Sequence, residues 1–205
     1  MIKRILSVVL ITVFSVGLVL AQDNNKVKKY FLPIGGHNQT AEYGSLIDLK
    51  DGKTYKVAEA SGRQGDIDLL YAFGKTTLAN LMTPNSSSLK QFGPNYKNKV
   101  DGEWETKNRG MMVAIKSDKA NKKIFKKIKK NADIKKLYTE TAKSVKSLPD
   151  YKELRHGPAR RLTHLEEGDL VLFRSQSRQF YAIGYVSSIK DGVKGVIEID
   201  FKVTQ

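Results

Sequence analysis

The chain has 205 residues, of which 40% are hydrophobic and 28% are charged, and it contains no cysteine. This composition argues against a disordered chain, and the length suffices for one domain with its own hydrophobic core. The absence of cysteine excludes disulfide bonds, a thiol nucleophile and the lipidated cysteine of a bacterial lipoprotein. The formal net charge of +15 favours acidic partners.

Residues 1–21 have the three-part pattern of a secretory signal peptide. Lys3 and Arg4 form a positive region, and an apolar run follows at 5–20. We therefore expect an exported protein, periplasmic or extracellular, whose mature chain begins near Gln22. The run is slightly shorter than the roughly 20 residues that span a bilayer. An uncleaved N-terminal anchor is therefore the alternative.

The positive charge is concentrated in one part of the chain. Loss of the signal peptide leaves 34 basic and 21 acidic residues, a net charge of +13. The segment from Lys116 to Lys146 contains twelve lysines and three acidic residues, so it alone has a net charge of +9. The rest of the mature chain is only weakly basic.

The mature chain begins with a polar stretch, and residues 22–41 are predicted to be an N-terminal tether. A single β-rich domain is expected from 42 to 205. Its first element is a β-hairpin, because two strand-like stretches flank the turn dipeptide Asp51-Gly52.

Several further stretches predict strands. Residues 66–74 alternate apolar and other side chains, which indicates a core strand. Residues 83–96 are rich in Pro, Asn, Ser and Gly and predict a long loop. Other strand-like stretches lie at 110–116, 169–174, 180–189 and 196–203, the last two joined by a second Asp-Gly turn.

A basic helical insertion is predicted at about 118–148. Apolar residues recur at helical spacing, with Ile124, Phe125 and Ile128 in a first helix and Ile134, Leu137, Tyr138, Ala142 and Val145 in a second. Asn131 or Asp133 would separate the helices and cap the second, and Pro149 would end it. The expected fold class is α+β, mostly antiparallel β, a sandwich or open barrel with two helices inserted mid-chain.

Several short motifs resemble a family of small exported β-rich domains of Gram-negative bacteria, a domain of unknown function that often occurs in surface lipoproteins. The motifs lie at 47–49, 52–60, 66–71, 81–85, 104–108, 168–173 and 199–203. The resemblance implies a β-rich exported domain and implies no activity, ligand or catalytic residue. This chain departs from the lipoproteins because it has no cysteine to carry a lipid.

The lysines of the insertion are the most distinctive candidates for ligand binding. They include Lys122, Lys123, Lys126, Lys127 and Lys130. In one interpretation the apolar stripe packs on the domain and the lysines are only solvated. In the other, the same lysines bind an anionic glycan, a membrane surface or an envelope protein. Lysines act as point charges, so such binding would depend on salt and be loosely specific.

Two further groups are candidate ligand-binding residues. Arg155, Arg160 and Arg161 form a smaller basic cluster suited to carboxylates or phosphates, although a plain surface loop would look the same. Trp104 lies between two glutamates and is predicted to be an exposed platform for stacking on sugars.

The sequence offers few candidates for catalysis or metal binding. Asp66 and Asp68 would share one face of a strand, and we interpret them as charge partners rather than as an acid and base pair. His37, His156 and His164 lack metal-ligand spacing. No nucleophile elbow or phosphate-binding glycine motif is present, so no catalytic residue, metal or cofactor is expected.

The function that this pattern favours is an exported, non-enzymatic binding domain for an anionic glycan or a cell-envelope partner. One alternative is an envelope hydrolase that uses Asp66, Asp68 or a histidine. Another is a structural component of the envelope held by protein contacts. Nucleic acid is not an expected partner, and the oligomeric state is left open.

Overall fold

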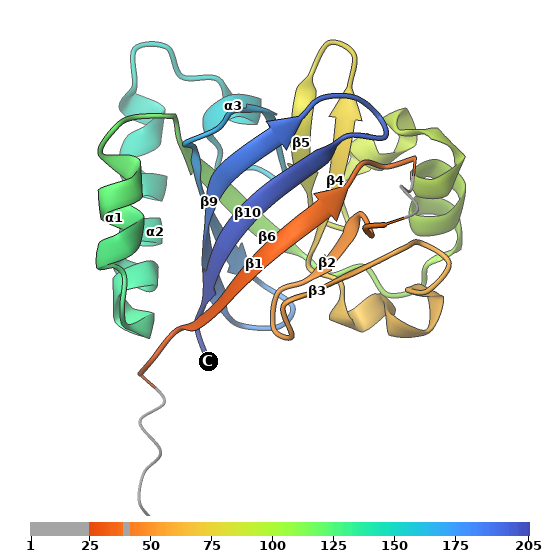
Figure 1. Cartoon of the computed structure of the whole chain (residues 1–205), viewed down its shortest axis with the longest axis horizontal. Coiled ribbons are helices and arrows are strands. Elements are labelled where there is room, and N and C mark those ends of the chain that lie inside the picture. The colour runs from red at the N-terminus through yellow and green to blue at the C-terminus, as the bar shows by residue number, and fades with distance from the viewer. Residues whose placement is uncertain (1–24, 39–41) are drawn as a thin grey trace, which may run out of the picture.

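The computed structural model describes residues 25–38 and 42–205, and the predicted signal peptide at 1–21 lies outside them. The described chain forms two five-stranded antiparallel sheets that pack as an open sandwich (Figure 1). The predicted fold class is confirmed, with a sandwich rather than a closed barrel.

Each sheet combines strands that are distant in the sequence. Sheet I contains, in spatial order, β1 (Lys28–Gly35), β10 (Val196–Val203), β9 (Tyr181–Lys190), β8 (Leu170–Ser175) and β6 (Gly110–Ile115). Sheet II contains β3 (Lys53–Tyr55), β2 (Leu46–Asp48), β4 (Leu69–Gly74), β5 (Leu78–Met82) and β7 (Arg161–Leu165). The first and last described strands are therefore neighbours, because β1 pairs with β10 along its whole length.

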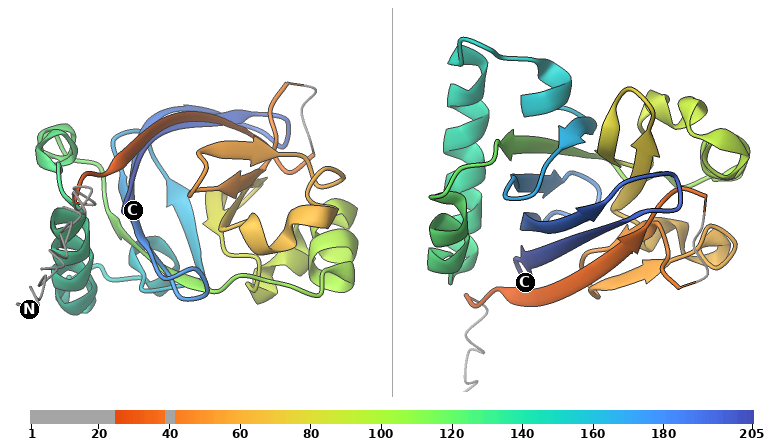
Figure 2. Two further views of the ribbon diagram at one scale, coloured as in Figure 1. Left: turned by 90° about the horizontal axis from the view of Figure 1, so that it is seen from below. Right: turned by 45° about the horizontal axis from the view of Figure 1, so that its top comes forward.

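Helical elements lie at both ends of the sandwich (Figure 2). At one end are α1 (Asn121–Lys127), α2 (Asn131–Ser144) and η4 (Val145–Ser147), whereas the short α3 (Glu153–His156) lies against β7 and β6. At the other end are the 3-10 helices η1 (Ser61–Asp66) and η2 (Ser87–Gln91) and the π-helix η3 (Asn95–Glu103).

Both faces of the central strands are buried, which explains why the core has several layers. In β8, Val171 and Phe173 face the core between the two sheets, whereas Leu170 and Leu172 face the helices. The helical layer contributes residues such as Ile134 of α2 to that second cluster. A third cluster lies between sheet II and the helices η2 and η3. Burial of these apolar surfaces is the main stabilising force.

The hairpins predicted from the Asp-Gly turns are present. β2 pairs with β3 around Gly52, whose φ of +63° favours glycine. The Tyr30 ring also lies so close to Gly52 that any Cβ would collide with it. β9 pairs with β10 in the same way around the second turn.

Three predicted elements differ from the structure. The tether at 22–41 is wrong for residues 28–35, which form β1, because Leu32 and Ile34 are buried between the sheets. The core strand begins at Leu69, since Asp66 ends η1. The predicted loop at 83–96 contains η2 and the start of η3, whose apolar residues pack under sheet II.

Candidate functional site

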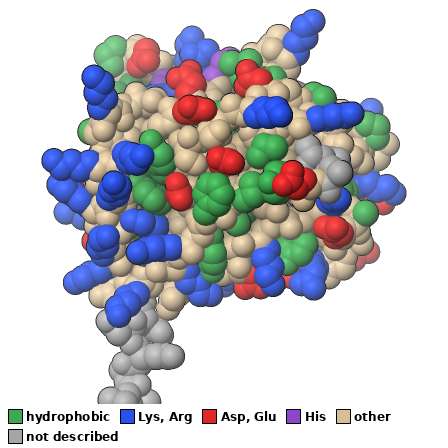
Figure 3. Space-filling view, in the orientation of Figure 1, with side chains coloured by type: hydrophobic (Ala, Val, Ile, Leu, Met, Phe, Trp, Pro, Cys, Tyr) green, Lys and Arg blue, Asp and Glu red, His purple; other side chains and the backbone are tan. Residues whose placement is uncertain are grey.

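Lysines from two distant segments form one surface, which we call the basic face. It consists of Lys26, Lys29, Lys122, Lys123, Lys126, Lys127, Lys129 and Lys130, all of them exposed. Figure 3 shows lysine and arginine side chains gathered over the end of the molecule that carries α1. The basic face therefore extends the predicted lysine helix with residues that precede or begin β1.

The two segments meet at a recess within the basic face. Lys26, Lys29, Lys129 and Lys130 line a cavity of about 550 Å³. Lys26 and Lys130 form an antiparallel bridge, and the Asn131 N–H donates to the Asn25 carbonyl oxygen at 3.0 Å. Four lysines from the two segments thus line one opening.

The position of α1 explains why its lysines are exposed. Ile128 is buried against sheet I, and Ile124 and Phe125 are partly buried in the same cluster. The lysines occupy the remaining surface of the helix. Among residues 25–38 and 42–205, no lysine of the basic face has an acidic group within 4.0 Å. The apolar stripe packs on the domain, as in the first of the two interpretations, and the described residues offer no ion pair to the lysines beside it.

Two charged side chains stabilise the junction between α1 and α2 through hydrogen bonds to its backbone. The Asp133 carboxylate accepts the backbone N–H groups of Lys129 and Lys130, each at 2.9 Å, and these hydrogen bonds lower its pKa. The Lys202 ammonium of β10 donates to the carbonyl oxygens of Phe125 at 2.5 Å and Ile128 at 2.8 Å. Burial lowers the pKa of Lys202 to about 8. The alternating sequence of β10 contains no signal for this role.

The arginine cluster does not form one site. Arg161 is only 4% exposed and is structural, so its prediction as a ligand-binding residue is wrong. Its guanidinium donates at 3.0–3.1 Å to the side chains of Asn80, Gln91 and Thr77. Arg160 is exposed just before β7, and Arg155 lies half-buried in α3.

Trp104 is 6% exposed, so the prediction of an exposed platform is also wrong. The chain leaves η3 in an extended conformation at this residue. That geometry lets the two flanking glutamates remain exposed while the indole joins Val57, Tyr96 and Val100 in the core under η3.

Asp66 and Asp68 do not form a carboxylate pair. Asp68 is buried, and Arg178 of the β8–β9 turn joins its carboxylate at 2.8 Å and that of Asp48 at 2.9 Å. The same guanidinium donates to the backbone carbonyl oxygen of Asp66. Burial raises the pKa of Asp68 to about 7, opposed by Arg178 and by the Leu49 N–H, which donates to Asp68 at 3.0 Å. This group, the Arg178 clamp, ties a turn of sheet I to sheet II.

The histidines are engaged in local structure. His37 and His156 are buried, and the Nδ1 of each accepts a backbone N–H, from Phe73 at 3.3 Å and Lys152 at 2.9 Å. His164 lies half-buried beside the Thr163 hydroxyl at 3.0 Å. Within the described ranges, no three histidine or acidic side chains are grouped so as to hold a metal ion.

The comparisons with known proteins inform the fold alone. No protein-family model and no curated protein matches the chain. A solved structure, that of a DUF4466 family protein from Parabacteroides merdae, is similar with a TM-score of 0.53 and 14% sequence identity. The similarity covers 88% of this chain and 54% of the other, so this chain spans about half the length of that protein.

That similarity agrees with the expected resemblance to an uncharacterised domain of Gram-negative bacteria. The class that the fold defines is an open antiparallel sandwich with helices at both ends. In the part of the chain that the structure describes, no helix has the length and apolar character needed to cross a membrane.

Proposed function

We propose that this protein is a non-enzymatic binding module that holds an acidic polysaccharide on its basic face. The observation that carries the proposal is the recess lined by Lys26, Lys29, Lys129 and Lys130. Two segments about one hundred residues apart in sequence bring these like charges together, at a cost in mutual repulsion. A bound polyanion would relieve that repulsion, so the arrangement is suited to binding one.

The chemistry of the face matches a repeating anion. Lysine ammonium groups are mobile point charges without the planar geometry by which arginine selects a single carboxylate or phosphate. The lysines of α1 extend the charge beyond the recess along one side of the molecule, so several charges of a polymer can be contacted at once. Binding of this kind weakens steeply with salt.

A binding role is also favoured over the hydrolase alternative. Of the two carboxylates that the hydrolase would use, Asp66 and Asp68, the second is buried and engaged by Arg178. The histidines accept or share local hydrogen bonds. The predicted export would place the module where acidic polysaccharides of the envelope occur.

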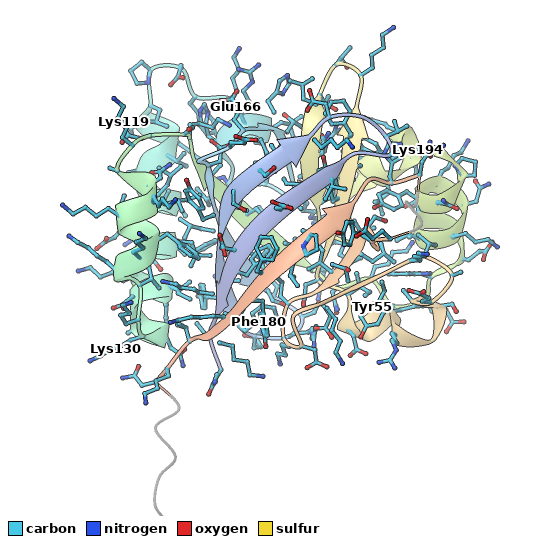
Figure 4. All side chains as sticks on the ribbon, in the orientation of Figure 1. Tyr55, Lys119, Lys130, Glu166, Phe180 and Lys194 are labelled. Atoms are coloured by element: carbon cyan, nitrogen blue, oxygen red, sulfur yellow. The ribbon has the colours of Figure 1, made fainter. Side chains whose placement is uncertain are left out.

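The test compares two variants with the same net charge. In the first, Lys26, Lys29, Lys129 and Lys130 are changed to Gln. In the matched control, the exposed lysines Lys75, Lys90, Lys97 and Lys194 are changed to Gln. Figure 4 places Lys130 at the α1 end and Lys194 at the opposite end. Heparin and alginate columns developed with a salt gradient give the readout.

We expect the wild type and the control to elute at similar, high salt and the basic-face variant to elute much earlier. Equal decreases in the eluting salt concentration of the two variants would contradict the proposal, because retention would then depend on net charge and not on the basic face. If the protein binds vesicles with phosphatidylglycerol and is retained on neither polysaccharide, the proposal is contradicted and the partner is a lipid surface.

A further inference from the structure

A second recess, of about 540 Å³, is lined by residues of η1, of η3 and of the turn before η1. These elements lie at the end of the molecule opposite α1 (Figure 1). The volume of the recess falls within the roughly 300–1,000 Å³ of small-molecule sites. We call it the η1–η3 recess. Its chemistry differs from that of the basic face, and it points to a different ligand.

The π-helix η3 forms one wall. Tyr96 and Val100 anchor η3 inward, both fully buried, and the Tyr96 hydroxyl donates to the Tyr71 carbonyl oxygen at 2.6 Å. Asn95, Lys99 and Glu103, spaced four residues apart, line the recess on the other side. π-Helical backbone is rare and is often found at functional sites.

The opposite wall consists of η1 and the turn before it, and hydrogen bonds tie it to the chain that leaves η3. The Gln64 side chain accepts the Thr106 N–H at 3.0 Å and donates to the Ser61 carbonyl oxygen at 3.0 Å. The Asn108 amide donates to the carbonyl oxygens of Gly65 at 2.6 Å and Ile67 at 2.9 Å. The recess is therefore preformed, so a ligand need not order its walls.

The lining combines apolar contact with hydrogen-bonding groups. The apolar part comes from Trp104, Val57 and Ala58. The Asn95 amide has no hydrogen-bond partner among the described residues, which leaves it available to a ligand. Lys99 and Glu103 form an ion pair, with the ammonium 2.8 Å and 3.0 Å from the two carboxylate oxygens.

That ion pair offers both a donor and an acceptor while cancelling its own charge. Lys56 lines the recess as well, so the lining is weakly basic, without the large positive excess of the basic face. A ligand that fits has an apolar ring face and many hydroxyl groups, and it needs no negative charge. We infer that the η1–η3 recess binds a neutral saccharide, with a ring against the apolar floor and hydroxyl groups on Asn95 and the Lys99–Glu103 pair.

The test uses a reporter that the chain already contains. Trp104 is the single tryptophan of the sequence and lines the recess, so a change in tryptophan emission reports on this place. The purified protein is titrated with neutral oligosaccharides (maltohexaose, cellohexaose, xylohexaose and chitohexaose), and isothermal calorimetry confirms any binding. At least one of them is expected to shift the emission in a saturable way.

Two variants localise the binding. Asn95→Ala removes one hydrogen-bonding group and is expected to weaken binding about fivefold to tenfold. Ala58→Phe fills the recess from an exposed position and is expected to abolish binding without loss of stability, which thermal unfolding checks. The basic-face variant with four glutamines is expected to bind the saccharide like the wild type.

The inference is overturned if none of the four saccharides changes the emission or releases heat. It is also overturned if Ala58→Phe binds like the wild type. These outcomes are independent of the column experiment, because the two sites lie at opposite ends and are changed by different substitutions.

Discussion

The basic face and the Arg178 clamp use the same kind of chemistry for opposite purposes. On the basic face, eight lysines point into water and none has an acidic partner among the described residues. In the clamp, Arg178 is 15% exposed at its side chain and joins two carboxylates that are 3% and 0% exposed. Solvated charges contribute little to stability, whereas a buried charge that loses its partner is costly. We therefore expect the stability of the fold to depend on the Arg178 clamp, and the binding of a partner to depend on the basic face.

The largest effect is expected from Arg178→Ala. It leaves Asp48 and Asp68 buried without their cation, and breaking such a group costs about 3–5 kcal/mol of unfolding free energy. Urea denaturation followed by circular dichroism measures the loss. Arg174→Ala, an exposed arginine of β8, is the control and should change stability far less. Equal losses in both variants would show that the clamp has no special role.

A smaller loss is expected from Lys202→Met, which keeps the aliphatic stem and removes the ammonium. The carbonyl oxygens of Phe125 and Ile128 at the end of α1 lose their donor, which should cost about 1–3 kcal/mol. The same urea experiment applies, with the exposed Lys190→Met on β9 as the control. A Lys202 variant as stable as the control would contradict the assigned role in holding α1.

The pH dependence of stability should change in Asp68→Asn. Burial raises the pKa of Asp68 to about 7 in the folded protein, whereas the carboxyl of the unfolded chain titrates near 3.8. Between these values the folded state holds a proton that the unfolded state has released. Asp68 therefore stabilises the fold fully below about pH 4, and this contribution is lost as the pH rises through about 7.

The measurement is the unfolding free energy from pH 4 to pH 8 for the wild type and Asp68→Asn. The decline across that window should be shallower in the variant. Asp150→Asn, an exposed aspartate, is the control and should keep the wild-type slope. A slope that Asp68→Asn leaves unchanged would mean that Asp68 is ionised throughout.

The smallest effect on stability is expected from the four basic-face substitutions to glutamine. Their side chains are solvated, so the unfolding free energy should stay within about 0.5 kcal/mol of the wild type. Relief of like-charge repulsion would make any change slightly stabilising. Urea denaturation measures the stability of this variant and the heparin column measures its binding. We expect it to lose binding while it keeps the fold. A loss of more than about 2 kcal/mol of unfolding free energy would show that these lysines stabilise the fold, as Arg178 is expected to do.

Local patterns in the sequence determined the elements and part of the candidate site. Strand-like apolar stretches predicted β6, β8, β9 and β10, and the two Asp-Gly turns predicted the hairpins. Helical spacing predicted α1 and α2 and the exposure of the lysines on α1. These features depend on neighbours a few residues away, which is why one sequence suffices to predict them.

Only the tertiary structure decided which distant residues meet. The pairing of β1 with β10 brings Lys26 and Lys29 beside Lys129 and Lys130, although the same stretch read alone suggests a tether. Trp104 and Arg161 look like surface residues among polar neighbours, yet they are buried. Burial of a side chain depends on strands and helices packed over it from elsewhere in the chain, and that information is absent from the local pattern.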